Sequence, residues 1–166
     1  MKPIELQSFH GFLFLRFQPG PQPDVAEWLA PYAEDFAAYG AVDALPVAGP
    51  GWGADLEVNW KSVRDVDNEG YHVALAHPGL QELYGRTYRD INLASGLNVS
   101  IGYFGDAPGR SWSVRNYLKY SDSDPALPDH LQAAWTYYGV FPNAVFAFTP
   151  EGMQFYQELP RDSGHP

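Results

Sequence analysis

The pattern of apolar and polar positions begins with a strand and a linker. The apolar run from Phe12 to Leu15 is too short to cross a bilayer and predicts a buried strand. The segment Gln18-Pro19-Gly20-Pro21-Gln22-Pro23 follows it and is rich in turn-forming residues, as an interdomain linker would be. We therefore expect a boundary there, with residues 1–20 as strand and linker and residues 21–166 as a second domain.

The next segment has helical spacing. Asp24 followed by Glu27 resembles a capping box, and Gly40 is placed to end the helix. Pro31 lacks an amide hydrogen, so a kink or a fresh helical start is expected there. The apolar positions that recur at helical spacing are Val25, Trp28, Leu29, Tyr32 and Phe36.

Two segments in the second half of the chain predict strands that pair. Trp112, Val114, Leu118 and Tyr120 alternate with polar residues, which is typical of a half-buried strand. The segment from Asn98 to Phe104 is expected to pair with this strand.

The pattern after these strands predicts a short helix followed by a hairpin. The helix is marked by Leu131, Trp135 and Tyr138. A strand from Asn143 to Phe148 and a turn at residues 149–152 then fold residues 153–159 back as a partner. In that partner the residues expected to face the core are Met153, Phe155 and Leu159. The whole pattern indicates an α+β fold, an antiparallel sheet with helices packed against it.

Composition narrows the class of protein. The 166 residues are 45% apolar and carry a net charge of −10, which suits one soluble domain and argues against nucleic acid or anionic lipid as a partner. The amino terminus lacks the apolar core of a secretory signal, so a cytoplasmic location is expected and no membrane association. Eleven Tyr, ten Phe and five Trp belong by default to the core, but could also line a pocket for a flat apolar substrate.

Candidate chemistry is concentrated in one segment that contains Glu69, His72 and His77. Two histidines and a carboxylate with open coordination positions are the ligand set of non-haem Fe(II) oxygenases, while histidines alone also suit zinc or copper. Glu69 and His72 are three residues apart and share a face of an ideal helix. His72 and His77 are separated by about 140° of helical rotation, so both reach one metal only if the helix ends or distorts between them. Pro78 supplies a reason for such a break at His77.

The short sequence motifs around the histidines resemble a family signature. Asn59-Trp60-Lys61, Glu69-Gly70-Tyr71-His72 and His77-Pro78-Gly79-Leu80 are similar to the catalytic domain of Rieske non-haem iron ring-hydroxylating oxygenases, α subunit. Residues 11–15 resemble the last strand of the Rieske domain, and Phe141-Pro142-Asn143 resembles a landmark before a sheet hairpin. The resemblance covers about residues 9 to 160 in the family order, and implies the helix-grip (START-like) architecture.

The resemblance implies a role for each candidate residue. His72 and His77 match the two histidine ligands of a mononuclear Fe(II). Glu69 matches an acidic residue that passes electrons from the Rieske cluster of a neighbouring subunit, and is then not itself a ligand. The implied partners are dioxygen, a small and aromatic substrate, Rieske-domain and reductase electron donors, and further copies of the chain in a homo-oligomer.

The resemblance also implies that two parts of the reaction centre lie elsewhere. The family's ligand carboxylate comes from a helix well over a hundred residues further along, so a partial catalytic domain is expected. A [2Fe–2S] Rieske centre needs two cysteines, and these 166 residues contain none. We therefore expect the chain to hold no 2Fe-2S cluster and to be inactive on its own.

Three alternatives stay open at the level of sequence. The chain could be a catalytically incomplete fragment or a helix-grip module that only binds a small molecule. It could be a fragment of a quaternary-amine monooxygenase or demethylase, because proteins similar to the family hydroxylate or demethylate quaternary amines. In a third interpretation Glu69 is itself the third ligand of a zinc or iron hydrolase, together with His72 and His77.

Overall fold

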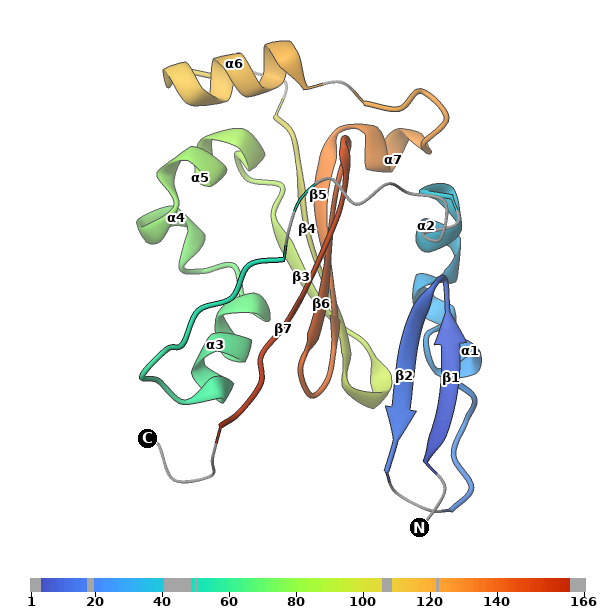
Figure 1. Ribbon diagram of the computed structural model, residues 1–166. Coiled ribbons are helices and arrows are strands. Elements are labelled where there is room, and N and C mark those ends of the chain that lie inside the picture. Colours follow the sequence, from blue (N-terminus) through green and yellow to red (C-terminus); the bar gives the residue numbers. More distant parts are fainter. Residues whose placement is uncertain are drawn as a thin grey trace. The chain divides into compact units, whose positions relative to one another are not determined.

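A computed structural model describes residues 4–17, 20–40, 49, 51–105, 109–121 and 123–161 (Figure 1). The chain forms two compact units, Met1–Gly53 and Ala54–Pro166. Residues 18 and 19 of the expected linker lie outside the described residues. The division into residues 1–20 and 21–166 therefore stays a prediction.

The first unit opens with a hairpin. Strand β1 (Glu5–Phe9) pairs with β2 (Phe12–Arg16) in antiparallel register. The strand predicted at residues 12–15 is present, but the expectation that it is buried is wrong. Leu13 is 68% and Leu15 59% exposed. Neighbouring side chains on a strand point to opposite faces, and the half-buried face of β2 carries Phe12, Phe14 and Arg16.

The predicted helix of the first unit is broken at Pro31, as expected. Helix α1 (Val25–Trp28) is followed by the 3-10 helix η1 (Ala30–Tyr32), with the proline in its first turn, and then by α2 (Ala33–Ala38). Gly40 comes two residues after the end of α2 and has a positive φ of 79°, a backbone conformation that favours glycine after a helix.

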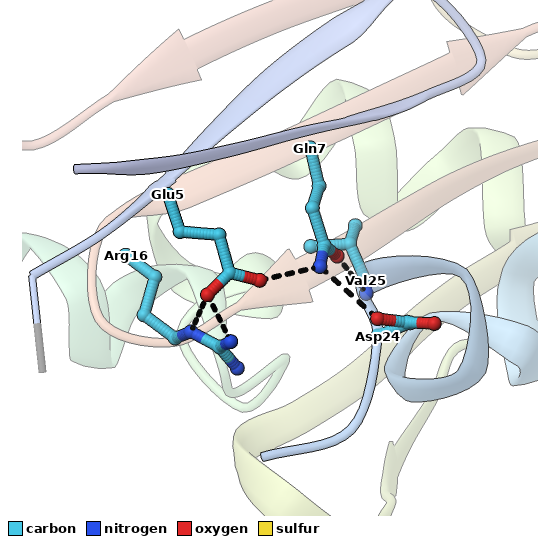
Figure 2. A network of polar contacts seen from close by, with 5 residues as sticks. All are labelled: Glu5, Gln7, Arg16, Asp24 and Val25. Atoms are coloured by element: carbon cyan, nitrogen blue, oxygen red, sulfur yellow. Dashed lines mark hydrogen bonds and ion pairs between the residues drawn. The ribbon is translucent and has the colours of Figure 1, made fainter. Parts of the chain in front are cut away.

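The expected capping box at Asp24 is wrong, because its side chain makes no cap hydrogen bond. Gln7 of β1 caps α1 instead: its Oε1 accepts from the Val25 amide at 2.6 Å (Figure 2). The side-chain Nε2 of Gln7 donates to Glu5 Oε1 at 2.7 Å and to Asp24 Oδ1 at 3.1 Å. Glu5 also pairs with Arg16 of β2, whose Nε donates to it at 2.9 Å. A side chain distant in sequence thus replaces the local cap.

The second unit is built on an antiparallel sheet. Within its described residues the strand order follows the chain, and the sheet does not close into a barrel. The strands are β3 (Arg89–Asn92), β4 (Leu97–Tyr103), β5 (Ala134–Val140), β6 (Ala144–Thr149) and β7 (Gly152–Gln157), with the 3-10 helix η3 (Ala94–Gly96) between the first two. The predicted α+β class is confirmed.

The two faces of this sheet differ in polarity. Tyr138, Phe146 and Phe148 lie on one face and are at most 1% exposed. The register places Ser100 and Tyr137 side by side on the other face. Helices α3 (Trp60–Asp67), α4 (Val73–Ala76) and α5 (Pro78–Tyr84) follow one another along one side of the sheet (Figure 1). Arg64 and Tyr84 of these helices contact the polar face.

The predicted strand at residues 112–120 is wrong, because this segment is helix α6 (Trp112–Tyr120). Ser111 caps it, with Oγ accepting from the Val114 amide at 3.3 Å. Val114, Tyr117 and Leu118 also satisfy helical spacing, and they pack in the cluster that contains Tyr84. The predicted partner at residues 98–104 is a strand, β4, but it pairs with β3 and β5.

The final predicted elements are largely correct. Helix α7 (Asp129–Gln132) is present but shorter than expected, since Trp135 and Tyr138 belong to β5. The hairpin of β6 and β7 is confirmed. Of the three residues expected to face the core, Met153 is half-buried, and Phe155 packs on the buried Phe146 with ring centroids 5.0 Å apart. Phe155 is nevertheless 42% exposed on this edge strand. Leu159 lies beyond β7 and is 70% exposed, so its placement in the core is wrong. Among the described helices, none combines the length and apolar character needed to cross a bilayer.

A buried arginine joins α3 to the sheet. Arg64 is 4% exposed. Its Nη1 donates to the Ala144 carbonyl of β6 at 3.3 Å, and its Nη2 donates to Asn98 Oδ1 of β4 at 3.1 Å. The guanidinium passes over Gly139 of β5, where a Cβ atom would lie 2.4 Å from Nη2 and 2.0 Å from Asn98 Oδ1. Only glycine leaves room for this contact.

We expect Gly139→Ala to lower the free energy of unfolding by about 1–3 kcal/mol, because the added methyl group overpacks the site and displaces the Arg64 guanidinium. Urea unfolding followed by circular dichroism measures this change. Gly79→Ala is the matched control: a Cβ there meets nothing within 4 Å, and alanine is the better helix former. Equal stability of the two variants would show that the position of the Arg64 guanidinium does not depend on the space left by Gly139.

Candidate functional site

The histidine segment is a helix, a turn and two further helices rather than one continuous helix. Asn59 starts α3, with Oδ1 accepting from the Lys61 amide at 2.9 Å. The chain leaves the helix after Asp67, so Glu69 lies in a turn and His72 at the start of α4. The expectation that Glu69 and His72 share the face of one helix is therefore wrong, although the turn still brings them together.

Glu69 holds His72 through two contacts. Its Oε1 lies 2.6 Å from His72 Nδ1, and its Oε2 accepts from the His72 backbone amide at 3.2 Å. Both side chains are 22% exposed. A carboxylate can only accept, so Nδ1 must carry a hydrogen and the unprotonated nitrogen of the neutral ring is Nε2. The contact thus prepares Nε2 of His72 as an electron-pair donor.

His77 lies at the helix break that its proline neighbour predicts. It ends α4 and precedes α5, with φ −128° and ψ 66°, and Pro78 occupies the first turn of α5. The break turns its imidazole toward that of His72: the ring centroids are 5.2 Å apart and the planes are at 79°. His77 is solvent-exposed and His72 is half-buried. The structure therefore brings the two predicted histidines together.

A glycine and an aspartate fix the turn that carries Glu69. The Gly70 amide donates to Asp90 Oδ2 at 2.7 Å, and Ser100 Oγ donates to the other oxygen of Asp90 at 2.8 Å. The ring of Tyr88 covers Gly70 so closely that a Cβ there would lie 1.9 Å from its Cε1. Glycine is therefore required at this position by the approach of Tyr88.

His72 and His77 line a cavity of about 140 Å³. A cavity of roughly this size accommodates a molecule as large as benzene. Its apolar wall is made by Val66, Val73 and Leu80. Its polar wall, besides the two histidines, is made by Asp67, Tyr84, Tyr88 and Tyr137.

The tyrosines of the wall stay protonated. Burial raises the pKa of Tyr84, of Tyr88 and of Tyr137 above the ordinary value of 10.0. The hydroxyl groups of Tyr84 and Tyr137 act on each other: their contact raises the pKa of Tyr84 and partly offsets the effect of burial on the pKa of Tyr137. The wall of the cavity thus carries neutral phenol groups.

Sequence reasoning missed the wall residues of this cavity. Asp67 carries a weak signal, since it lies three residues after Arg64 and shares its face of α3. The tyrosines of the wall have no such signal in the sequence, because their contact depends on helices and strands that are distant along the chain. No group of three His, Cys, Asp or Glu suited to a metal occurs within the described residues. The carboxylate of Glu69 faces Nδ1 of His72, so its interpretation as a third metal ligand has no support in this geometry.

Comparison with known proteins identifies relatives by family and by fold. The family model described as "Ring hydroxylating alpha subunit (catalytic domain)" matches residues 43–165. No curated protein matches the sequence. A crystal structure of the quaternary ammonium Rieske monooxygenase CntA with an inhibitor is similar, with a TM-score of 0.62 and 18% identity. Another structure of a quaternary ammonium Rieske monooxygenase, which gave insights into carnitine oxidation by gut microbiota and inter-subunit electron transfer, has a TM-score of 0.60 and 18% identity.

These similarities extend over nearly the whole of this chain but not of its relatives. Each covers 93% of this chain and 42% of the solved one. The chain thus spans less than half the length of the solved structures that it matches. At this level of identity the likeness establishes the fold.

The contact between Glu69 and His72 predicts a single tautomer for the neutral ring. We expect long-range ¹H–¹⁵N NMR correlations to show His72 protonated at Nδ1, and Glu69→Ala to move the proton to Nε2, the usual position without a partner. Glu57→Ala removes an exposed acid elsewhere in the second unit and is the control. An unchanged tautomer in Glu69→Ala would contradict the pairing.

Proposed function

Because the chain belongs to the family of ring-hydroxylating oxygenase α-subunit catalytic domains, we propose that His72 and His77 are two protein ligands of a mononuclear Fe(II). In the same proposal, Glu69 is the bridge for electrons. The observation that carries the proposal is the approach of the two imidazoles across one cavity, with Glu69 bonded to Nδ1 of the first.

The residues present fit two positions of a non-haem iron site. Imidazole nitrogen is a good ligand for Fe(II), and a carboxylate behind a ligating histidine is the usual support for its orientation. Among the described residues no carboxylate completes the set. We propose that the third ligand comes from a segment outside residues 1–166, as the family resemblance implies. When bound, iron would supply the activation of dioxygen.

The residues of this chain position the reacting molecules. Glu69 fixes the ring of His72, while Val66, Val73 and Leu80 provide an apolar wall that excludes water from part of the cavity. The half-buried Glu69 side chain keeps contact with solvent, as a bridge to an external electron donor requires. We propose a Rieske-domain protein or a neighbouring subunit as that donor. Assembly into a homo-oligomer stays a prediction, as does the cytoplasmic location.

A role without catalysis is the main alternative. A module that only binds a small molecule would need the cavity, but not an electron-pair donor on each imidazole. The Glu69 contact prepares such a donor on His72, which favours the metal site over simple binding.

We expect anaerobic Fe(II) titration to show binding that is lost in the double variant His72→Ala/His77→Ala, since two of the ligands are removed. Calorimetry measures the affinity, and Co(II) gives an independent visible spectrum. His130→Ala, which removes an exposed histidine of α7, is the control and should bind as the wild type does. Equal binding by the double variant would disprove the site.

Two substrate classes fit the cavity. The aromatic content of the chain favours a small aromatic molecule, and the volume suits a single ring. An organic cation is the second candidate, because the wall combines three tyrosine rings with the Asp67 carboxyl group. Aromatic faces and a negative charge are the groups that recognise quaternary ammonium. The similar solved structures are described as quaternary ammonium monooxygenases, which supports this second candidate.

Toluene and tetramethylammonium separate the two classes. If the substrate is a cation, tetramethylammonium binds, and the double variant Asp67→Asn/Glu158→Gln, which removes both neighbouring acids, weakens it at least about tenfold, which corresponds to 1.4 kcal/mol of lost charge interaction. Toluene binding depends on the apolar wall and should be unchanged by that variant. Binding of toluene alone would favour the aromatic class. Ligand-observed NMR measures both.

A further inference from the structure

A buried carboxyl group faces Asp67, a residue of the cavity wall, and has no role in the proposed iron site. Glu158 follows β7 and is 7% exposed. Its backbone amide donates to the Asn143 carbonyl at 3.2 Å. Both oxygens of its side chain are buried and have no hydrogen-bond donor among the described residues. An ionised carboxylate in this position would be costly.

The neighbour of Glu158 is another carboxyl group. Asp67 of α3 faces it and raises its pKa, and Tyr156 Oη donates to Asp67 Oδ1 at 2.9 Å. Two ionised carboxylates are both acceptors and cannot bond to each other. Their contact becomes a hydrogen bond when one proton lies between them. Neighbouring acids in other proteins hold a proton for this reason.

The charges around the pair also favour one proton. Arg64, on the same helix as Asp67, is the cation that acts on Glu158. The phenol groups that face the pair come from Tyr156 of β7 and Tyr137 of β5. With one proton shared, one negative charge remains and the guanidinium balances it. Burial and then Asp67 raise the pKa of Glu158, while Arg64 lowers it by less.

We propose that Asp67 and Glu158 share one proton and that the pair is a proton donor to the cavity, with Asp67 presenting the proton at the wall and Glu158 positioning it. Asp67 lines the cavity directly. In the transfer, the O–H bond that holds the shared proton breaks and its electron pair stays on the carboxylate oxygen of the pair. The proton binds a basic atom of the molecule in the cavity, and a proton from solvent then restores the pair. The shared proton is a property of the protein without metal.

Infrared spectroscopy of the chain at neutral pH tests the shared proton. We expect the C=O band of a protonated carboxylic acid, which is lost in both Glu158→Gln and Asp67→Asn because the new amide donates to the remaining carboxylate and ionises it. Glu151→Gln is the control. Partial burial raises the pKa of Glu151, but hydrogen bonds from Ser121 and Thr149 outweigh this and lower it, so its removal should leave the band unchanged.

The rate of deuterium exchange tests the role as donor. His77 on the same cavity is exposed, so the band should shift soon after transfer to D₂O, without unfolding of the chain. A band that is absent from the wild type, or that survives in both variants, overturns the shared proton. Protection as strong as that of the most buried amides overturns the donor role.

The wild type provides a test that does not depend on the folding of any variant. Because the folded-state pKa of Glu158 is raised above the ordinary value of 4.5, the folded state holds the proton more tightly than the unfolded state. The contribution of this proton to the free energy of unfolding is fully present below a pH of about 4.5, the ordinary pKa, and is lost as the pH rises through the folded-state pKa of Glu158. We expect the infrared band and this part of the free energy of unfolding to disappear over the same pH range. If the infrared band and this part of the free energy of unfolding are lost over different pH ranges, the proposal is contradicted.

Discussion

The second unit depends on the burial of one charged side chain, Arg64. A guanidinium taken out of water is costly unless its hydrogen bonds and its charge are both compensated. Asn98 and the Ala144 carbonyl accept hydrogen bonds from its two terminal nitrogens, and Glu158 is the acid on which its charge acts, while Nε has no partner among the described residues. These requirements hold α3 against β4 and β6. They also place Asp67 at the wall of the cavity, and set where the chain leaves α3 toward the histidines.

The opening for this arginine is made by the sheet. Gly139 and Gly102 lack side chains where Arg64 and Tyr84 cross the strands, so α3 and α5 approach the backbone closely. The sheet consequently has one polar face, occupied by the site, and an opposite face with buried aromatic rings such as Phe146 and Phe148. The two faces of the sheet thus have different roles. The apolar face buries aromatic side chains, and the polar face carries the residues of the candidate site.

The histidine segment combines local and distant constraints. The break at Pro78 and the capping of α3 by Asn59 act within a few residues. The turn between these two points is fixed from far along the chain, by Asp90 and by the ring of Tyr88 over Gly70. Glu69 then pairs with His72 in a geometry that no helix provides. A site of this kind is positioned by the sheet as much as by its own segment.

The sequence by itself determined the α+β class, the break at His77, the β6–β7 hairpin and the family, because these follow from proline, turn residues, short periodic patterns and a local motif. It did not distinguish a strand from a helix at residues 112–120, where the apolar positions fit both periods until α6 packs against Tyr84. It also placed Leu159 in the core, since the pattern did not reveal that β7 ends at Gln157. Only the tertiary structure decided the cavity wall and the Asp67–Glu158 contact, because those residues are far apart in the chain and meet through strand register.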